Sequence, residues 1–533
     1  MFDILREPDD IRVICENENT DAKVRVEIKE RKLYVRLQAD AAYPEFICMR
    51  WNHRIKEPVK IMGDKWERSY GDMEWHSLNG EIFMPWYFLA NNGNETVGCG
   101  VMVQPNSFVS FQCDASGVTA WFDVRCGAKG VKLGGRELLA GVIVCEHYTD
   151  CSAFTAAKEF CKVMSPNPRL PKEPVYGSNN WYYAYGKSSY EEIMQDADII
   201  AELAGQNENK PFMVIDDGWS VNRCAGPWRS NEKYGDMNRV VDGFRKRNVK
   251  PGLWFRPLHD KEAEELHPEW RLKKSEPGSG SPDWIKIDNG KYLGYLDPSH
   301  PEVKEYLRAI IKQFRDWGFE LIKHDFSTYD MFDFFGDTLN GKIAIAKNWA
   351  FYEEHKTSAE VVLDLYRLIR EAAGDMIIIG CNTVSHLSAG IFELNRTGDD
   401  TSGREWSRTR AYGVNTLAFR LCQNNSFYMV DADCVGVLED NIDWKLNRQW
   451  LDLLARSGSP LFVSLQPEML TEEMKQDLKE AFRCNSKQQD IAEPLDWQYN
   501  NQPQRWDING EVTEYDFVMD SYPLLLDKKI QPY

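Results

Sequence analysis

The sequence predicts a multidomain protein with α/β and all-β parts: an N-terminal antiparallel β-sandwich, a central (β/α)8 TIM barrel and a short C-terminal β element. Two observations favour this fold. Residues 1–168 contain short alternating strand-like segments, whereas residues 169–490 alternate apolar runs with amphipathic helical segments. A chain of 533 residues is also too long for a single hydrophobic core. Residues 491–533 form the predicted C-terminal element.

The N-terminal region shows the alternation of polar and apolar residues that is typical of half-buried strands. Asn-Gly, Asn-Asn and Ala-Ser-Gly turn signals separate these segments. The predicted strands are Val24–Ile28, Leu33–Leu37, Gly98–Val103, Phe108–Cys113, Thr119–Val124 and Leu139–Cys145. A short helix at Phe154–Met164 and a Pro-rich linker at Pro166–Pro174 then lead into the barrel.

A different kind of strand follows, in which a short apolar run ends abruptly in polar or charged residues. Parallel strands that are buried on both faces have such continuous apolar runs. After a first strand at Gly177–Tyr185, the predicted strands are Phe212–Asp217, Leu253–Arg256, Leu321–Asp325, Ile377–Asn382, Phe392–Asp400, Tyr428–Asp433 and Leu461–Gln466. In a TIM barrel the carboxyl ends of the strands meet on one face, where catalytic side chains lie.

Segments with helical periodicity lie between these strands. In Glu302–Trp317, for example, apolar residues recur on one face at helical spacing. The predicted helices are Tyr190–Leu203, Tyr234–Arg247, Glu302–Trp317, Glu360–Ala373, Arg404–Leu421, Trp444–Ala455 and Glu472–Phe482. The tail after about residue 492 predicts two or three short strands around Trp497 and Trp506.

The composition limits the partners that this chain can have. Its net charge of −19 and pI near 5.1 argue against binding to nucleic acid or to an anionic membrane. The N-terminal MFDILREPDD has no basic region followed by an apolar stretch, so we expect no signal peptide. The 13 cysteines are scattered without CxxC pairs, which favours reduced thiols and a cytoplasmic location.

Carboxylates recur at the ends of the predicted barrel strands. They are Asp216, Asp217, Asp325, Asp399, Asp400, Asp431 and Asp433. Any one of them could cap a helix or form a loop salt bridge. Their recurrence at equivalent positions instead favours glycoside hydrolysis, which needs two carboxylates about 5–5.5 Å apart for retention or about 6.5–9.5 Å apart for inversion.

Eight motifs occur in an order that resembles one known family. They are NNWYYAYG (Asn179–Gly186), DDGW (Asp216–Trp219), GLW (Gly252–Trp254), LDPSHPEV (Leu296–Val303) with Trp317-Gly318, KHD (Lys323–Asp325), Gly380-Cys381, RTGDDT (Arg396–Thr401) and SGSPLF (Ser457–Phe462). Over residues 1 to about 490 the chain resembles the α-galactosidases of glycoside hydrolase family 36, in clan D.

This resemblance implies that Asp325 is the nucleophile and Asp400 the acid and base. Lys323 lies two residues before Asp325 on the same strand, so it points to the same side and favours the ionised carboxylate. Asp399 is a neighbouring acid that raises the pKa of Asp400. The choice of Asp400 over Asp399 depends on the four-residue spacing from Arg396.

The resemblance also implies a set of substrate contacts. Asp216 and Asp217 would bind the sugar 4- and 6-hydroxyls, and Trp254 would stack on the apolar face of the ring. Cys381 and Arg396 would reach the hydroxyls near C2. Buried carboxylates that accept hydrogen bonds discriminate an axial 4-hydroxyl better than an apolar wall could. We interpret Asp431 and Asp433 as structural.

Four further residues are candidates for specificity: Trp181, Arg256, His386 and Asp399. Arg256 departs from the family pattern, so it could recognise an acidic or substituted sugar or pair with a nearby carboxylate. His386 could face the pocket or lie in the core. Trp75 and Trp86 could lend an aromatic ring to the pocket or belong to the sandwich core.

The sequence therefore predicts a retaining, exo-acting α-galactosidase that needs no metal or cofactor and acts on a small carbohydrate. The same mechanism on α-N-acetylgalactosaminides or on pentopyranosides such as β-L-arabinose is an alternative, as is transfer to another sugar. A third hypothesis is that the protein is a non-catalytic carbohydrate-binding homologue. The strand ends lack the His clustering of a metal-dependent hydrolase. The oligomeric state is left open.

Overall fold

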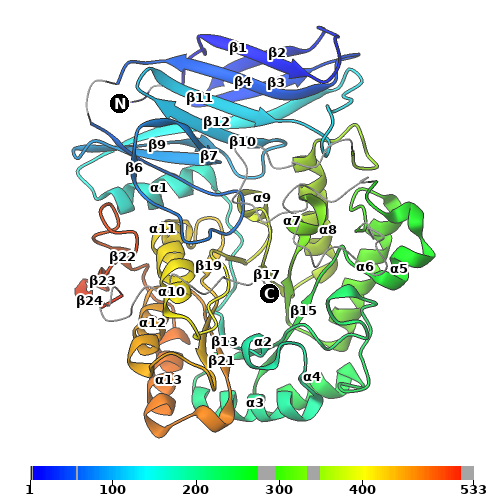
Figure 1. Ribbon diagram of the computed structural model, residues 1–533, viewed down its shortest axis with the longest axis vertical. Coiled ribbons are helices and arrows are strands. Elements are labelled where there is room, and N and C mark those ends of the chain that lie inside the picture. The colour runs from blue at the N-terminus through cyan, green and yellow to red at the C-terminus, as the bar shows by residue number, and fades with distance from the viewer. Residues whose placement is uncertain (1, 3, 56–57, 274–294, 333–348, 518–533) are drawn as a thin grey trace, which may run out of the picture.

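The N-terminal region forms two antiparallel sheets that pack face to face (Figure 1). The computed structural model describes residues 2, 4–55, 58–273, 295–332 and 349–517. One sheet has the order β1-β4-β11-β10-β7 and the other β2-β3-β12-β9-β8-β5-β6. Their strands are β1 (Asp10–Cys15), β2 (Lys23–Lys29), β3 (Lys32–Gln38), β4 (Pro44–Asn52), β5 (Lys60–Gly63), β6 (His76–Ser77), β7 (Asn79–Pro85), β8 (Tyr87–Asn91), β9 (Glu95–Val101), β10 (Phe108–Asp114), β11 (Gly117–Asp123) and β12 (Glu137–Thr149). The predicted sandwich is confirmed.

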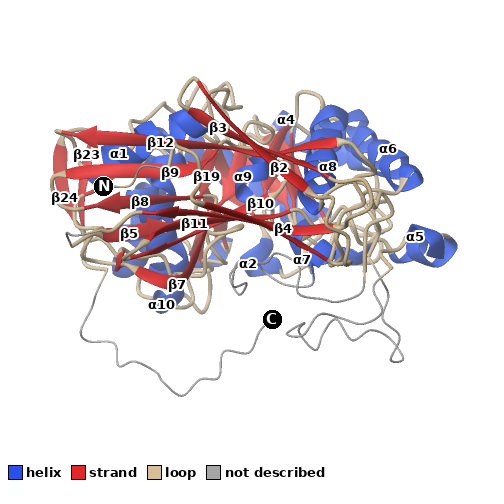
Figure 2. Cartoon of the chain, turned by 90° about the horizontal axis from the view of Figure 1, so that it is seen from above, coloured by secondary structure: helices blue, strands red, loops and turns tan. Residues whose placement is uncertain are grey.

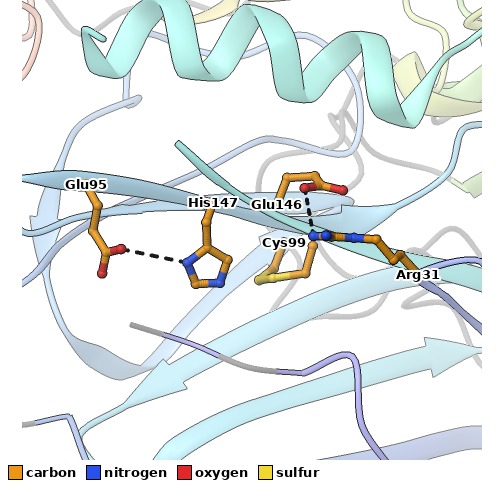
Figure 3. The surroundings of a disulfide bond; sticks show 6 residues. Arg31, Glu95, Cys99, Glu146 and His147 are labelled. Carbon is orange, nitrogen blue, oxygen red and sulfur yellow. Dashed lines mark hydrogen bonds and ion pairs between the residues drawn. A yellow bond between two sulfur atoms is a disulfide. The ribbon is translucent and has the colours of Figure 1, made fainter. Parts of the chain in front are cut away.

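Two cysteines of this sandwich form a disulfide. Cys99 on β9 and Cys145 on β12 lie directly opposite each other in the ladder, with Cα atoms 4.2 Å apart. Figure 3 shows the bond between two neighbouring pairs, Glu95 with His147 and Arg31 with Glu146. The prediction of reduced thiols is wrong for this pair, because cysteine spacing does not reveal which strands pair. The cytoplasmic location stays a prediction.

The barrel is a parallel sheet with the order β19-β18-β17-β16-β15-β14-β13-β21-β20. Its strands are β13 (Tyr176–Asn179), β14 (Phe212–Ile215), β15 (Lys250–Phe255), β16 (Leu321–His324), β17 (Ile377–Gly380), β18 (Leu394–Arg396), β19 (Met429–Asp431), β20 (Cys434–Val437) and β21 (Leu461–Leu465). β19 pairs with β18 and β20 with β21, so the seventh barrel strand is split into two pieces that join the two ends of the sheet. The predicted TIM barrel is confirmed.

The helices lie mostly around the barrel, and α1 packs against β9 and β12 of the sandwich (Figures 1 and 2). They are α1 (Ala153–Met164), α2 (Trp181–Ala184), α3 (Tyr190–Ala204), α4 (Met237–Lys246), α5 (Lys261–Leu266), α6 (Pro301–Trp317), α7 (Ser327–Phe332), α8 (Ser358–Ala373), α9 (Ser385–Ser388), α10 (Trp406–Arg408), α11 (Thr416–Arg420), α12 (Trp444–Arg456) and α13 (Glu472–Asn485). Local sequence sets their ends. Thr357 and Glu360 form a capping box at α8, while Pro301 begins α6 and Gly318, at φ 93°, ends it.

Two predicted elements differ in the structure. The first barrel strand ends at Asn179 rather than Tyr185, because Trp181–Ala184 turns into α2. The predicted helix Arg404–Leu421 is interrupted by a π-helical turn, Thr409–Asn415, between α10 and α11. Gly413 in this turn lies against the Trp450 ring, where an added Cβ would come within 2.8 Å. Such π-turns often lie at functional sites.

The chain after the barrel forms a three-stranded antiparallel sheet of β22 (Glu493–Pro494), β23 (Arg505–Ile508) and β24 (Glu511–Glu514). This confirms the predicted β element. Trp497 packs its ring edge-on against Trp75 of the sandwich and Phe154 of α1. The C-terminal element therefore packs against the sandwich and α1. The exact boundaries at residues 168 and 490 stay a prediction. In the described part of the chain, none of the helices has the length and apolar character needed to span a bilayer.

Candidate active site

The side chains predicted to do chemistry meet at the carboxyl ends of the barrel strands. Beneath them the barrel interior is filled by apolar residues from alternate strand positions, including Val214, Leu321, Ile379 and Phe462. Just above this layer is a small cavity. It is lined by Asn179, Val214, Lys323, Ile379, Arg396, Asp431, Asp433, Cys434 and Phe462. Residues from eight barrel strands, β13, β14 and β16–β21, thus line one cavity.

Asp325 follows β16 and is held as a buried carboxylate. Trp254 Nε1 donates a hydrogen bond to Oδ2 at 2.9 Å, and Asn382 Nδ2 donates to Oδ1 at 2.5 Å. The backbone N–H of Phe326 also donates to Oδ1, at 2.7 Å. Burial alone would raise the pKa of Asp325, but the Lys323 charge and the hydrogen bonds from the Trp254 and Asn382 side chains lower it below its ordinary value. The structure therefore favours the ionised form.

Lys323 contacts the carboxylate pair that follows β14. Its Nζ lies 2.7 Å from Oδ2 of Asp216, which also accepts a hydrogen bond from Asn179 Nδ2 at 2.7 Å. Asp217 pairs with Arg223, at 3.2 Å. Burial raises the pKa of Asp217 to about 6, with the Asp216 charge adding to this and Arg223 opposing it. Asp217 Oδ1 is buried without a hydrogen-bond partner, so it can accept one from a ligand hydroxyl.

Arg396 on β18 joins three predicted site residues. Its guanidinium lies 3.7 Å from Cys381 Sγ, 3.4 Å from Asp400 Oδ1 and 3.1 Å from Asp433 Oδ1. Asp433 in turn accepts hydrogen bonds from the Thr401 backbone N–H, at 2.7 Å, and from the Tyr182 hydroxyl. Asp433 therefore fixes both Arg396 and the loop that carries Asp400, which fits the structural role expected of it.

Asp400 has a very different environment from Asp325. Its side chain is 39% exposed at the barrel mouth. Desolvation raises its pKa, and the neighbouring charges of Asp399 and Asp433 raise it further, while Arg396 and Arg68 oppose them. Two carboxylates whose surroundings push their pKa values in opposite directions are the arrangement that an acid and a nucleophile need.

Two candidate specificity residues occupy positions away from open space. Arg256 is 3% exposed and makes two-pronged contacts to Asp330, with Nη2 at 2.5 Å and Nε at 2.9 Å. Of its two predicted roles, Arg256 therefore has that of pairing with a nearby carboxylate. His386 is fully buried, with Nε2 2.7 Å from the Val101 carbonyl and its ring stacked on Trp86. The pocket-facing alternative is therefore wrong for His386.

Of the remaining aromatic and acidic candidates, two are buried and two are partly exposed. Trp75 and Trp86 are buried in the packing between the sandwich and the barrel, so neither lends a ring to the pocket. Trp181 begins α2 and is partly exposed, with its ring 5.2 Å from that of Tyr185. Asp399 pairs with Arg68 at 3.1 Å and with Arg408 at 3.4 Å.

Several residues of the site were missed from the sequence. Asn382 and Asn179 lie at the ends of β17 and β13, so the strand-end pattern could have found them. Arg223 lies in the loop after β14, with φ at 56°, and nothing in its surroundings in the sequence marks it. Arg68 comes from the other domain and has no sequence signal at all. In the described part of the chain, no group of three or more His, Cys, Asp or Glu residues is placed to bind a metal.

Comparison with solved structures identifies the fold. No protein-family model matches the chain, and no curated protein is significantly similar to it in sequence. Among solved structures, an α-galactosidase from Thermus thermophilus in complex with p-nitrophenyl α-D-galactopyranoside superposes with a TM-score of 0.61 at 16% identity, over 95% of this chain and 97% of that one. The family 36 α-galactosidase AgaA from Geobacillus stearothermophilus, in complex with raffinose, gives 0.60 at 14% identity, over 87% and 67%.

The chain has the fold of the family 36 α-galactosidases. An α-galactosidase from Lactobacillus brevis matches over 96% of this chain and 73% of its own, with a TM-score of 0.56 and 12% identity. The likeness thus includes the sandwich and the barrel together. At such low identity it establishes the architecture, and the chemistry has to be argued from the side chains.

Proposed function

We propose that this protein is a retaining, exo-acting α-galactosidase in which Asp325 is the nucleophile and Asp400 the acid and base. The observation that carries the proposal is the contrast between the two carboxylates. Asp325 is buried and stabilised as an anion by three hydrogen-bond donors, whereas Asp400 is partly exposed and has a raised pKa. This contrast lies at the strand ends of a barrel shared with known α-galactosidases.

The proposed reaction has two displacement steps. Asp325 attacks the anomeric carbon from one face while Asp400 gives its proton to the departing glycosidic oxygen, which leaves as an alcohol. The sugar is then held as an ester on Asp325. Asp400, now ionised, removes a proton from water, and the resulting hydroxide displaces Asp325 from the anomeric carbon. The product keeps the α configuration of the substrate.

Three of the substrate contacts proposed by resemblance can be compared with the geometry. Asp217 Oδ1 is a buried acceptor that a sugar hydroxyl can satisfy. Trp254 is 2% exposed and donates its indole N–H to Asp325, so it orients the proposed nucleophile. Cys381 and Arg396, which the resemblance places near C2, are each 2% exposed and contact each other. We therefore expect little room for an N-acetyl group there and propose galactose as the preferred sugar.

The affinity for galactose is expected to fall as pH drops through about 6. Below that pH Asp217 takes up a proton, since its pKa is raised to about 6, and it loses the charge that strengthens its hydrogen bonds to sugar hydroxyls. Calorimetric titration with galactose between pH 5 and 7.5 measures this. The Asp217→Asn variant should bind more weakly and without this dependence. A wild-type affinity that is constant across the range would contradict the assignment.

The proposed function is tested by a panel of p-nitrophenyl glycosides: α-galactoside, α-N-acetylgalactosaminide and β-L-arabinopyranoside. We expect the α-galactoside to be hydrolysed fastest, with α-galactose as the first product in proton NMR. The Asp198→Asn variant, altered on the barrel surface in a salt bridge to Arg247, serves as a control and should match the wild type. Hydrolysis of none of the three by folded protein would overturn the proposal.

A further inference from the structure

A loop of the N-terminal sandwich is fastened to the barrel at several points. This loop, residues 64–75, joins β5 to β6, and Figure 1 shows it reaching from the sandwich towards the barrel. Asp64 and Arg420 of α11 form a fully buried ion pair at 2.8 Å. At the other end of the loop, the Asn415 side chain donates to the Met73 carbonyl at 2.8 Å. The loop is therefore held in a fixed position over the barrel mouth.

The middle of this loop continues the barrel's own backbone pairing. The Ser69 N–H donates to the Thr397 carbonyl at 2.7 Å, and Ser69 forms a parallel β-bridge with Gly398. Gly398 lies between the loop and the π-helical turn, where an added Cβ would come within 2.0 Å of the Tyr412 carbonyl oxygen. Glycine is required at this close approach. The bridge brings this part of the loop alongside the segment that carries Asp399 and Asp400.

From this position the Arg68 side chain contacts both acids. Its side chain is only 7% exposed, with Nη2 3.1 Å from Asp399 Oδ1 and Nη1 3.9 Å from Asp400 Oδ1. The Tyr70 hydroxyl accepts a hydrogen bond from Nε at 3.2 Å and fixes the plane of the guanidinium. A planar fork of donors can span two neighbouring carboxylates in this way, whereas an ammonium group cannot.

We propose that Arg68, which belongs to the N-terminal sandwich, is a positioning residue for the acid and base Asp400. The barrel alone therefore lacks one of the cations that this carboxyl contacts. The inference rests on the proposed function. Arg68 ties down Asp399 and touches Asp400 on Oδ1, the same oxygen that Arg396 approaches. Oδ2 of Asp400 is thus the oxygen that carries the proton to the leaving group.

The charges around Asp400 determine how its pKa changes when Arg68 is replaced. The groups that face Asp400 are Arg68, Tyr182, Arg396, Asp399, Arg408 and Asp433. Burial, Asp399 and Asp433 raise the pKa of Asp400, and Arg396 and Arg68 lower it. Without Arg68 the ionised form loses one of its cations, and Asp399 loses its nearest partner. The pKa of Asp400 then rises, so the acid stays protonated to a higher pH.

The test is the pH profile of kcat/KM for an α-galactoside in three variants. In Arg68→Met we expect the alkaline limb to move up by about one pH unit, with kcat/KM at the wild-type optimum lowered roughly tenfold. Arg68→Lys keeps the charge, so its limb should lie between those of wild type and Arg68→Met. Asp399→Asn removes an anion instead, so its limb should move down. Opposite shifts from the two neighbours separate an electrostatic role from a structural one.

The matched control is Arg136→Met. Arg136 also joins the sandwich to the barrel, through Glu360 at 2.6 Å and the His355 carbonyl at 2.7 Å, but at α8 rather than at the site. Its alkaline limb should be that of the wild type. An unshifted limb in Arg68→Met, or an equal shift in Arg136→Met, would overturn the inference while leaving the proposed function intact. A wild type that hydrolyses no galactoside would overturn both.

Discussion

Replacement of Asp325 by alanine is expected to lower kcat/KM for p-nitrophenyl α-galactoside by at least about 10^4-fold. The carboxylate lies at the centre of a cluster whose members all stabilise its anion: Trp254, Asn382 and the Lys323 charge. The nearby Asp216 is engaged by Lys323 and Asn179, so we do not expect it to replace Asp325. Steady-state kinetics on purified protein, with the melting temperature measured alongside, separate lost chemistry from lost folding.

Azide provides a sharper version of this experiment. In the Asp325→Ala variant a small anion can enter the space left by the carboxylate and attack the anomeric carbon, while Asp400 still protonates the leaving oxygen. The product is then β-galactosyl azide, of inverted configuration, because only one displacement occurs. Added azide should restore p-nitrophenol release in Asp325→Ala and leave Asp198→Asn unaffected. Restored activity that yields the α-azide would assign the nucleophile to another residue.

The strand-end side chains of the site could be predicted because local sequence determines them. A parallel strand buried on both faces needs an unbroken apolar run, so the residue that ends the run marks the barrel mouth. Asp216, Asp325 and Arg396 were located in this way. In the structure Lys323 connects them, because it pairs with Asp216, lowers the pKa of Asp325 and lines the same cavity as Arg396. The N-terminal strands were predicted less completely, since β1 and β4–β8 were not recognised.

The features that could not be predicted depend on contacts between distant segments. Arg68 lies 331 residues before Asp399, since the two are at positions 68 and 399, and only the packing of two domains brings them together. The disulfide between Cys99 and Cys145 requires knowledge of which strands pair and in which register. The π-helical turn at Thr409–Asn415 lies against the Trp450 ring and is hydrogen-bonded through Asn415 to the sandwich loop, and neither contact can be read from the local sequence.

Replacement of Asp400 by alanine is expected to have an effect that depends on the leaving group. For melibiose, whose leaving alcohol must be protonated, kcat/KM should fall by about 10^2–10^4-fold, the usual contribution of general acid catalysis. For 2,4-dinitrophenyl α-galactoside the loss should be much smaller, because this phenolate departs without a proton. The comparison also decides between the two adjacent acids. Asp399 is held by Arg68 and Arg408, whereas Asp400 is 39% exposed at the barrel mouth. Asp399→Ala should therefore affect both substrates equally, and a leaving-group dependence in that variant instead would move the acid role to Asp399.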